Sequence, residues 1–187
     1  LKREDAIREI LTNIGKRDLL VTTTGKISRE AYEQSDLIYG NHNQLFLTVG
    51  SMGHAPMIAL GVAQSNPDKR IFCIDGDGAA LMHMGSMNTI AHQPCENFVH
   101  IVLNNAAHES VGGMPTNCAN SDFSQFAKVL GYSHAYRVNT IEQLQRALHM
   151  IHKESGPILL EIQVALGARA DLGRPKESAK ANKEAFM

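Results

Sequence analysis

Short apolar segments alternate with helix-like segments along the chain, and this alternation constrains the fold more than any other feature. The apolar segments predict strands at 19–21, 45–49, 70–74, 98–103, 134–138 and 158–164. Periodicity and capping patterns predict helices at 2–13, from 28, and at 55–64, 81–92, 122–130 and 141–153. Alternation of this kind favours α/β architecture, so we expect a parallel sheet flanked by helices on both faces.

Composition and charge narrow the class of protein. The 187 residues, 43% of them hydrophobic, suffice for one domain with a buried core. Eighteen basic against 19 acidic residues give a formal charge of −1, which does not favour nucleic acid or an anionic membrane as a partner. No apolar run approaches the roughly 18 residues of a membrane-spanning helix. Three cysteines without a CxxC pair and the absence of an apolar leader indicate a soluble, cytoplasmic protein.

The domain is expected to occupy residues 1–165, with the polar segment 166–187 as a C-terminal tail along the surface or a partner. The segment 106–121 lacks periodicity and is longer than most connections, which is typical of functional loops. Because the chain begins with Leu1, we expect a processed product or a piece of a longer polypeptide.

Glycine and polar residues directly follow four of the predicted strands. These groups are Thr24-Gly25, Gly50 to Gly53, Gly76 to Gly78 and Asn104-Asn105. Ligands of open parallel sheets bind beyond the carboxyl ends of the strands, so we expect the four turns to converge on one site.

Two of these turns favour a diphosphate together with a divalent cation. Asp77 lies between glycines that allow close backbone approach, and the helix that follows would direct its amino terminus at an anion. Asn105 would add an amide oxygen at the end of the next strand, and Mg²⁺ prefers oxygen ligands. Either turn alone is more often only structural, but the pair at this separation is more specific.

This pair of turns resembles the signature of the thiamine diphosphate enzymes, and residues 20–165 resemble their diphosphate-binding domain. The resemblance implies thiamine diphosphate and Mg²⁺ as cofactors, with Mg²⁺ held by the side chains of Asp77 and Asn105 and the carbonyl of Ala107. The residues implied to contact the cofactor are these three together with Gly25, Lys26, Ser28, Gly50, Ser51, Met52, Gly53, Gly76, Gly78, Ala79 and Ala80.

The resemblance also implies more particular roles. Met52 would be a wedge that bends the cofactor so that its two rings face each other; the alternative is an ordinary core methionine. His108 and Ser110 are the candidate catalytic residues. His108 would donate a proton or contact the anionic substrate, unless it is a surface or structural histidine. Ser110 would donate hydrogen bonds to that substrate, and Lys26 or Arg29 would supply positive charge.

Three segments, 24–30, 103–113 and 171–175, resemble the members of the family that decarboxylate phosphonopyruvate. The implied reaction releases phosphonoacetaldehyde and CO₂. The chain has Glu109 and Met114 where that pattern more often has Asp and Gln, so the sulfonate analogue, sulfopyruvate, remains an alternative substrate. A chain that binds the cofactor without catalysis is the other alternative.

The resemblance implies a missing half of the active site. In this family the glutamate that activates the cofactor lies on a pyrimidine-binding domain, N-terminal to the diphosphate domain or on another chain. Since no such domain is recognisable in the 187 residues, we expect a partner domain or subunit, and an oligomeric enzyme with a small anionic 2-keto acid as substrate.

Overall fold

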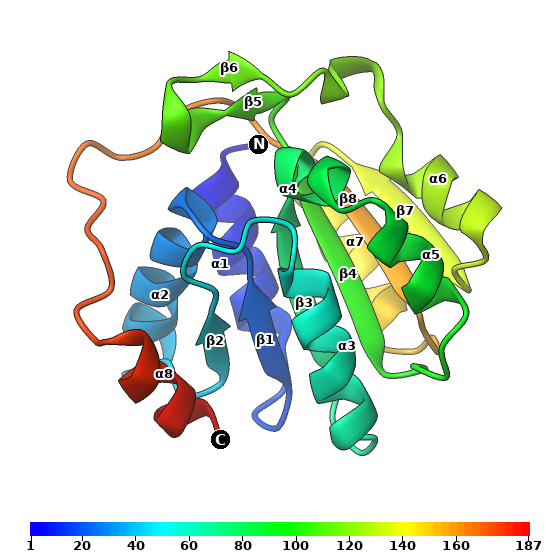
Figure 1. Ribbon diagram of the computed structural model, residues 1–187, viewed down its shortest axis with the longest axis horizontal. Helices are drawn as coiled ribbons and strands as arrows, with labels where there is room; N and C mark the ends of the chain where they lie inside the picture. Colours follow the sequence, from blue (N-terminus) through cyan, green and yellow to red (C-terminus); the bar gives the residue numbers. More distant parts are fainter.

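The computed structural model describes all residues, 1–187, and contains a six-stranded parallel sheet. Its strands lie in the order β2-β1-β3-β4-β8-β7 (Figure 1). Their bounds are β1 (Leu19–Thr22), β2 (Leu45–Leu47), β3 (Ile71–Gly76), β4 (Phe98–Asn104), β7 (His134–Val138) and β8 (Ile158–Gln163). The predicted α/β class is therefore confirmed.

Helices cover both faces of this sheet and bury two separate apolar clusters. One face carries α1 (Arg3–Asn13), α2 (Lys26–Tyr39) and α7 (Ile141–Ile151). The other carries α3 (Ala55–Ser65), α4 (Asp77–Met82), α5 (Gly85–Ala91) and α6 (Phe123–Leu130). Every residue of β4 is buried, as expected for a central parallel strand covered on both sides.

The C-terminal segment lies against one edge of the sheet. After crossing the surface it ends in α8 (Ala179–Phe186), which packs beside β2 (Figure 1). The Asn182 side chain accepts a hydrogen bond from the Leu47 amide and donates one to the Leu45 carbonyl, both at 2.9 Å. These bonds satisfy edge groups of β2 that would otherwise be open to another strand.

Three local predictions differ from the structure. The helix expected at 81–92 is divided into α4 and α5, because the helical turn already begins at Asp77 and the backbone leaves helical geometry at His83. The strand expected at 45–49 ends at Leu47. The segment 106–121 is not without structure: it contains an antiparallel hairpin of β5 (Ala107–His108) and β6 (Met114–Pro115), and two short 3₁₀ turns.

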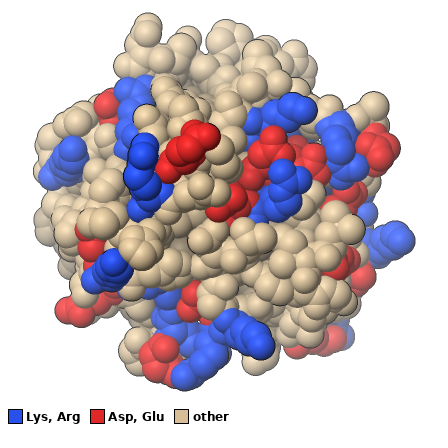
Figure 2. Space-filling view, turned by 180° about the vertical axis from the view of Figure 1, so that it is seen from behind, with Lys and Arg blue, Asp and Glu red and all other residues tan.

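Charge is mixed over the back of the molecule, and no helix is both long and apolar enough to cross a membrane. Figure 2 shows acidic and basic side chains interspersed over the back of the molecule, without a broad region of one sign. That distribution agrees with the balanced numbers of acidic and basic residues.

Candidate cofactor-binding site

A cavity of about 320 Å³ opens at the carboxyl ends of β1, β3 and β4, beneath the β5–β6 hairpin. The register of the sheet places Gly76 beside Leu103, so the residues after β3 and β4 emerge next to each other. The predicted site residues that line the cavity are Gly25, Lys26, Met52, Gly76, Asp77, Gly78, Ala79, Asn105, Ala107, His108 and Ser110. The structure thus brings most of the predicted site together.

The other predicted cofactor residues do not line this cavity. Ser28 faces a neighbouring cavity and donates its hydroxyl to the Gly25 carbonyl at 3.0 Å. Gly50 and Ser51 are exposed in the loop before α3, whereas Gly53 and Ala80 are buried below the site. A Cβ atom on Gly53 would lie 3.0 Å from the Ala79 carbonyl oxygen, so this glycine allows the Met52 loop to pack closely on α4.

Asp77 begins α4 and lies buried at the cavity wall, with only 3% of the residue exposed. The Thr116 hydroxyl donates a hydrogen bond to its Oδ2 atom. Desolvation raises the pKa of Asp77 above its ordinary value, and the bonds from Thr116 and the Gly78 amide only partly oppose this. A cation placed beside the carboxylate would relieve the cost of its burial.

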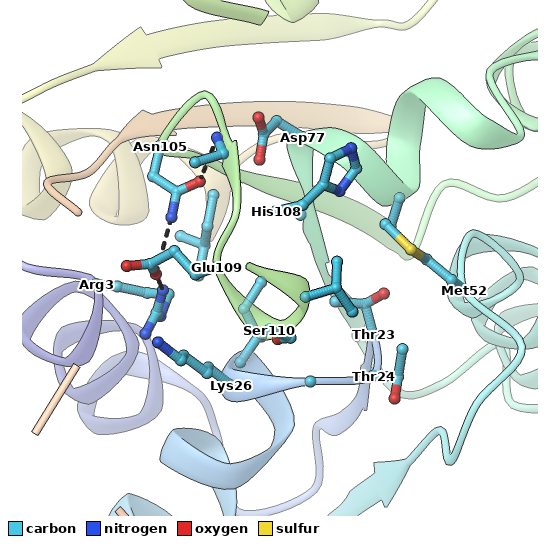
Figure 3. A pocket seen from close by; sticks show the side chains of 18 of the residues that line it. Arg3, Thr23, Thr24, Lys26, Met52, Asp77, Asn105, His108, Glu109 and Ser110 are labelled. Atoms are coloured by element: carbon cyan, nitrogen blue, oxygen red, sulfur yellow. Dashed lines mark hydrogen bonds and ion pairs between the residues drawn. The ribbon is translucent and has the colours of Figure 1, made fainter. Parts of the chain in front are cut away.

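Oxygen ligands for such a cation come from two neighbouring strand ends. Asp77 and Asn105 line the same cavity, and Figure 3 shows both side chains along its upper side; Ala107 follows Asn105 in the same turn. A carboxylate, an amide oxygen and a backbone carbonyl suit Mg²⁺, which completes its shell with phosphate oxygens and water. No three His, Cys, Asp or Glu side chains cluster to hold a metal by themselves, so a bound anion would have to supply further ligands.

The Asn-Asn turn is shaped by its own side chains. Asn104 Oδ1 accepts from the Ala106 amide at 3.1 Å, and Asn105 Oδ1 accepts from the Ala107 amide at 3.0 Å. These two bonds hold Ala106 at φ +59°, a conformation that L residues seldom adopt. Asparagine is the residue type that offers the backbone this local acceptor, which explains why the chain turns at that place.

Two glycines permit close approaches across the cavity. A Cβ atom on Gly78 would lie 2.4 Å from Cε1 of His108, and one on Gly25 would lie 2.7 Å from the Ser110 hydroxyl. Gly25 also has φ +97°, which disfavours any side chain there. The candidate catalytic residues His108 and Ser110 therefore pack directly over the two predicted diphosphate turns.

One buried polar atom faces the cavity without a partner. The Thr23 hydroxyl, on a residue only 3% exposed, makes no hydrogen bond within the protein. Buried hydroxyls are nearly always paired, so this atom fits a ligand that supplies an acceptor. Lys26 and Arg29 also line the cavity, and neither makes an ion pair with a carboxylate within 4.0 Å. An anionic group such as a diphosphate fits this wall.

Met52 occupies the side of the cavity opposite Asn105 (Figure 3). It is half-buried and belongs to neither of the two buried apolar clusters. Its thioether lines the cavity wall, which is where an apolar support for a bound ring system would have to stand.

Sequence reasoning missed a charged network at the cavity rim. Arg3, at the start of α1 and only 4% exposed, donates to Glu30 at 2.7 and 2.8 Å and also pairs with Glu109. Desolvation opposes the charge of Glu109, but hydrogen bonds from the Gly167 amide and Arg3 outweigh it and lower the pKa of this carboxyl. Arg3 and Glu109 lie 106 residues apart, so no local pattern links them. Thr116, the partner of Asp77, was missed for the same reason.

The fold and the cavity define an open α/β domain whose ligand site lies at the carboxyl ends of the strands. Residues 24–162 match the thiamine pyrophosphate enzyme family, C-terminal TPP binding domain. The match covers most of the chain, and the chain belongs to this family, whose domain binds thiamine diphosphate (thiamine pyrophosphate). The resemblance inferred from the sequence motifs is confirmed.

The curated relatives include two groups of decarboxylases. Phosphonopyruvate decarboxylase of Streptomyces hygroscopicus is 36% identical over 174 residues, covering 93% of this chain and 42% of the relative. Sulfopyruvate decarboxylase subunit beta of Methanocaldococcus jannaschii is 35% identical over 131 residues, covering 70% of this chain and 66% of the relative. The chain thus spans less than half the length of the phosphonopyruvate decarboxylases that it matches.

A solved structure supports the fold independently. An X-ray structure from Mycobacterium smegmatis, assigned to the thiamin diphosphate-dependent enzymes, superposes with a TM-score of 0.71. The superposition covers 89% of this chain and 32% of the Mycobacterium smegmatis chain, and the two sequences are 17% identical. At that identity the similarity shows a shared fold.

Proposed function

We propose that this chain forms the diphosphate- and Mg²⁺-binding half of the active site of a thiamine diphosphate-dependent 2-keto acid decarboxylase. Phosphonopyruvate is the proposed substrate, with phosphonoacetaldehyde and CO₂ as products. The observation that carries the proposal is the convergence of Asp77, Asn105 and Ala107 with two glycine turns on one cavity. The similarity to phosphonopyruvate decarboxylases over 91–93% of the chain supports it.

In this proposal each wall of the cavity binds one part of the cofactor. Asp77, Asn105 Oδ1 and the Ala107 carbonyl hold Mg²⁺, and the cation neutralises part of the diphosphate charge. The turns at Gly25 and Gly78 admit the diphosphate close to the backbone, and the unpaired Thr23 hydroxyl donates to it. When bound, thiamine diphosphate supplies the electron sink that makes loss of CO₂ from a 2-keto acid feasible.

The remaining residues of the cavity act on the substrate and on the geometry of the site. Met52 supports the cofactor from the wall opposite the metal ligands. Lys26 and Arg29 attract the second anionic group of the substrate, because no carboxylate of this chain already pairs with them. In this proposal His108, which packs over Gly78, moves a proton at the reacting carbon, and the Ser110 hydroxyl donates a hydrogen bond to the substrate; both residues line the cavity.

The rest of the active site is proposed to come from a pyrimidine-binding domain or subunit within an oligomer. The relatives named as subunit beta of sulfopyruvate decarboxylase are separate chains of a similar extent: one from Methanothermobacter thermautotrophicus is covered over 84% of its length. Sulfopyruvate is the second candidate substrate, because the chain matches both classes of relative at about the same identity.

The test compares the two acids on the assembled enzyme. The chain is combined with its pyrimidine-binding half, loaded with thiamine diphosphate and Mg²⁺, and CO₂ release is measured from phosphonopyruvate and from sulfopyruvate. The proposal predicts a higher kcat/KM for phosphonopyruvate. A higher kcat/KM for sulfopyruvate would make sulfopyruvate the substrate in place of phosphonopyruvate. Tight cofactor binding without decarboxylation of either acid would refute the catalytic role.

A further inference from the structure

We propose that Glu109, held by Arg3, is a positioning residue that turns the Asn105 side chain so that its oxygen, not its nitrogen, faces the metal position. This inference rests on the proposed function of Asn105 as a metal ligand. It concerns a different group of residues, because neither Arg3 nor Glu109 is proposed to touch the metal.

The hydrogen bonds of Asn105 define its orientation. The two ends of an asparagine amide have nearly the same shape, so only their partners decide which end is oxygen. Asn105 Nδ2 donates to Glu109 Oε2 at 3.0 Å, and an ionised carboxylate can only accept. A flipped amide would place its oxygen 3.0 Å from Glu109 Oε2, where two acceptors repel each other. It would also set its NH₂ group against the N–H of Ala107, where two donors meet. The carboxylate and the Ala107 amide therefore both oppose the flipped state.

Glu109 can do this because it is fixed at both of its oxygens. Oε1 accepts from the Gly167 amide, and Oε2 accepts from both Arg3 and Asn105. Arg3 is in turn fixed by two bonds to Glu30, which is 1% exposed. Figure 3 shows Arg3, Glu109 and Asn105 joined in one row along the cavity wall. A buried, fully paired arginine thus holds the carboxylate in the ionised form that the amide requires.

The preceding asparagine is held in the same manner. Asn104 Nδ2 donates to Oε1 of the fully buried Glu161 at 2.9 Å, while its Oδ1 accepts from the backbone two residues on. Each asparagine of the turn therefore has one carboxylate behind its NH₂ group. This repetition indicates that the orientation of both amides is specified by the fold.

Glu109→Gln tests the inference with little change of shape. Glutamine can accept from Asn105 or donate to it, so it pairs with either orientation, and only the Ala107 amide still opposes the flip. Its NH₂ group also replaces one of the two oxygens that accept from Arg3 and from the Gly167 amide. Loss of a group that orients a metal ligand typically weakens metal binding about 10- to 100-fold. We expect Glu109→Gln to weaken Mn²⁺ binding about 10-fold in a paramagnetic resonance titration of the chain with saturating thiamine diphosphate. Arg3→Lys keeps the charge without the two-pronged donor, and a smaller loss is expected.

Matched controls carry the same substitutions at exposed sites. Glu184→Gln removes a carboxylate from the surface pair with Lys180, and Arg8→Lys alters the surface pair with Asp5 on the same helix as Arg3. Both should bind Mn²⁺ like the wild type. Unchanged Mn²⁺ affinity in Glu109→Gln, with or without a lower melting temperature, would overturn the positioning role and leave only a structural one.

A second readout separates this inference from the proposed function. Hydrogen exchange of the Asn105 side-chain amide, measured by NMR on the chain without cofactor, should be slow in the wild type and at least several-fold faster in Glu109→Gln. Equal exchange in the two proteins would overturn the inference. Absence of Mn²⁺ and thiamine diphosphate binding by the wild type would instead refute the proposed cofactor site, and the exchange measurement would still decide the orientation of Asn105.

Discussion

The Asp77→Asn protein should be more stable than the wild type in the absence of ligands, and less stable than the wild type in the presence of Mg²⁺ and thiamine diphosphate. The pKa of Asp77 lies above its ordinary value in the folded chain because of desolvation, so the unfolded chain ionises this carboxyl more readily. The ionised group therefore lowers stability at neutral pH, and this penalty disappears as the pH falls below the ordinary value of about 3.9. Asparagine retains an acceptor for Thr116 and carries no charge to desolvate.

The size of the effect follows from burial of an incompletely paired group. Because Thr116 and the Gly78 amide already donate to Asp77, the gain lies near the low end of the usual range, about 1 kcal/mol. For a chain of this size, 1 kcal/mol corresponds to about 2–4 °C in Tm. At 100 times Kd, Mg²⁺ and thiamine diphosphate should add about 2.7 kcal/mol, or roughly 5–10 °C, to the wild type and nothing to Asp77→Asn.

Thermal unfolding with EDTA, and then with Mg²⁺ and thiamine diphosphate, should therefore reverse the order of the two proteins. Asp68→Asn, which alters an exposed ion pair with Arg17, serves as the matched control and should follow the wild type in both conditions. The reasoning would be refuted by an Asp77→Asn protein that melts below the wild type in EDTA, or that gains as much from the ligands.

Three further predictions concern other parts of the molecule. Met52→Ala in the assembled enzyme should lower kcat by about tenfold, or 1.4 kcal/mol of barrier, with little change in cofactor affinity; normal kcat with a loss of about 2–5 kcal/mol of stability, seen in denaturant unfolding, would indicate a core methionine instead. Asp122→Ala should lower stability by about 1 kcal/mol, because Asp122 caps α6 by accepting from the Gln125 amide. Desolvation opposes the charge of Asp122, but hydrogen bonds, including that from Gln125, lower its pKa. The stability difference between Asp122→Ala and the wild type should therefore be present above about pH 4 and vanish as the pH falls through the lowered pKa. A stability difference that persists at pH 2 would contradict this. The 187-residue chain by itself should release no CO₂ from phosphonopyruvate, and measurable phosphonoacetaldehyde from the pure chain would show that it needs no pyrimidine-binding half.

The strand ends were predictable because they depend on local pattern. Apolar runs that stop at glycine or asparagine identify where parallel strands end, and parallel topology then requires those ends to meet. Gly76 to Gly78 and Asn104-Asn105 were placed at one cavity edge for that reason. Resemblance to a known family added the assignment of Ala107 and Met52, which composition and periodicity alone do not indicate.

The remaining features depend on contacts between distant residues. Arg3 opens an amphipathic helix and has the pattern of a surface residue, yet it is buried between Glu30 and Glu109. The break at His83 was missed because apolar spacing continues through it, although the backbone does not. The β5–β6 hairpin pairs only two residues on each side, which is too short to leave an alternating pattern.

The central claim is that Asp77, Asn105 and Ala107 together hold the cation of a bound diphosphate. A crystal structure of the chain grown with Mg²⁺ and thiamine diphosphate tests it most directly. The account predicts one octahedral ion about 2.0–2.1 Å from an Asp77 carboxylate oxygen, from Asn105 Oδ1 and from the Ala107 carbonyl oxygen, with diphosphate oxygens completing its shell. An ion bound away from these three residues, or a diphosphate seated in the neighbouring cavity beside Arg174, would contradict it.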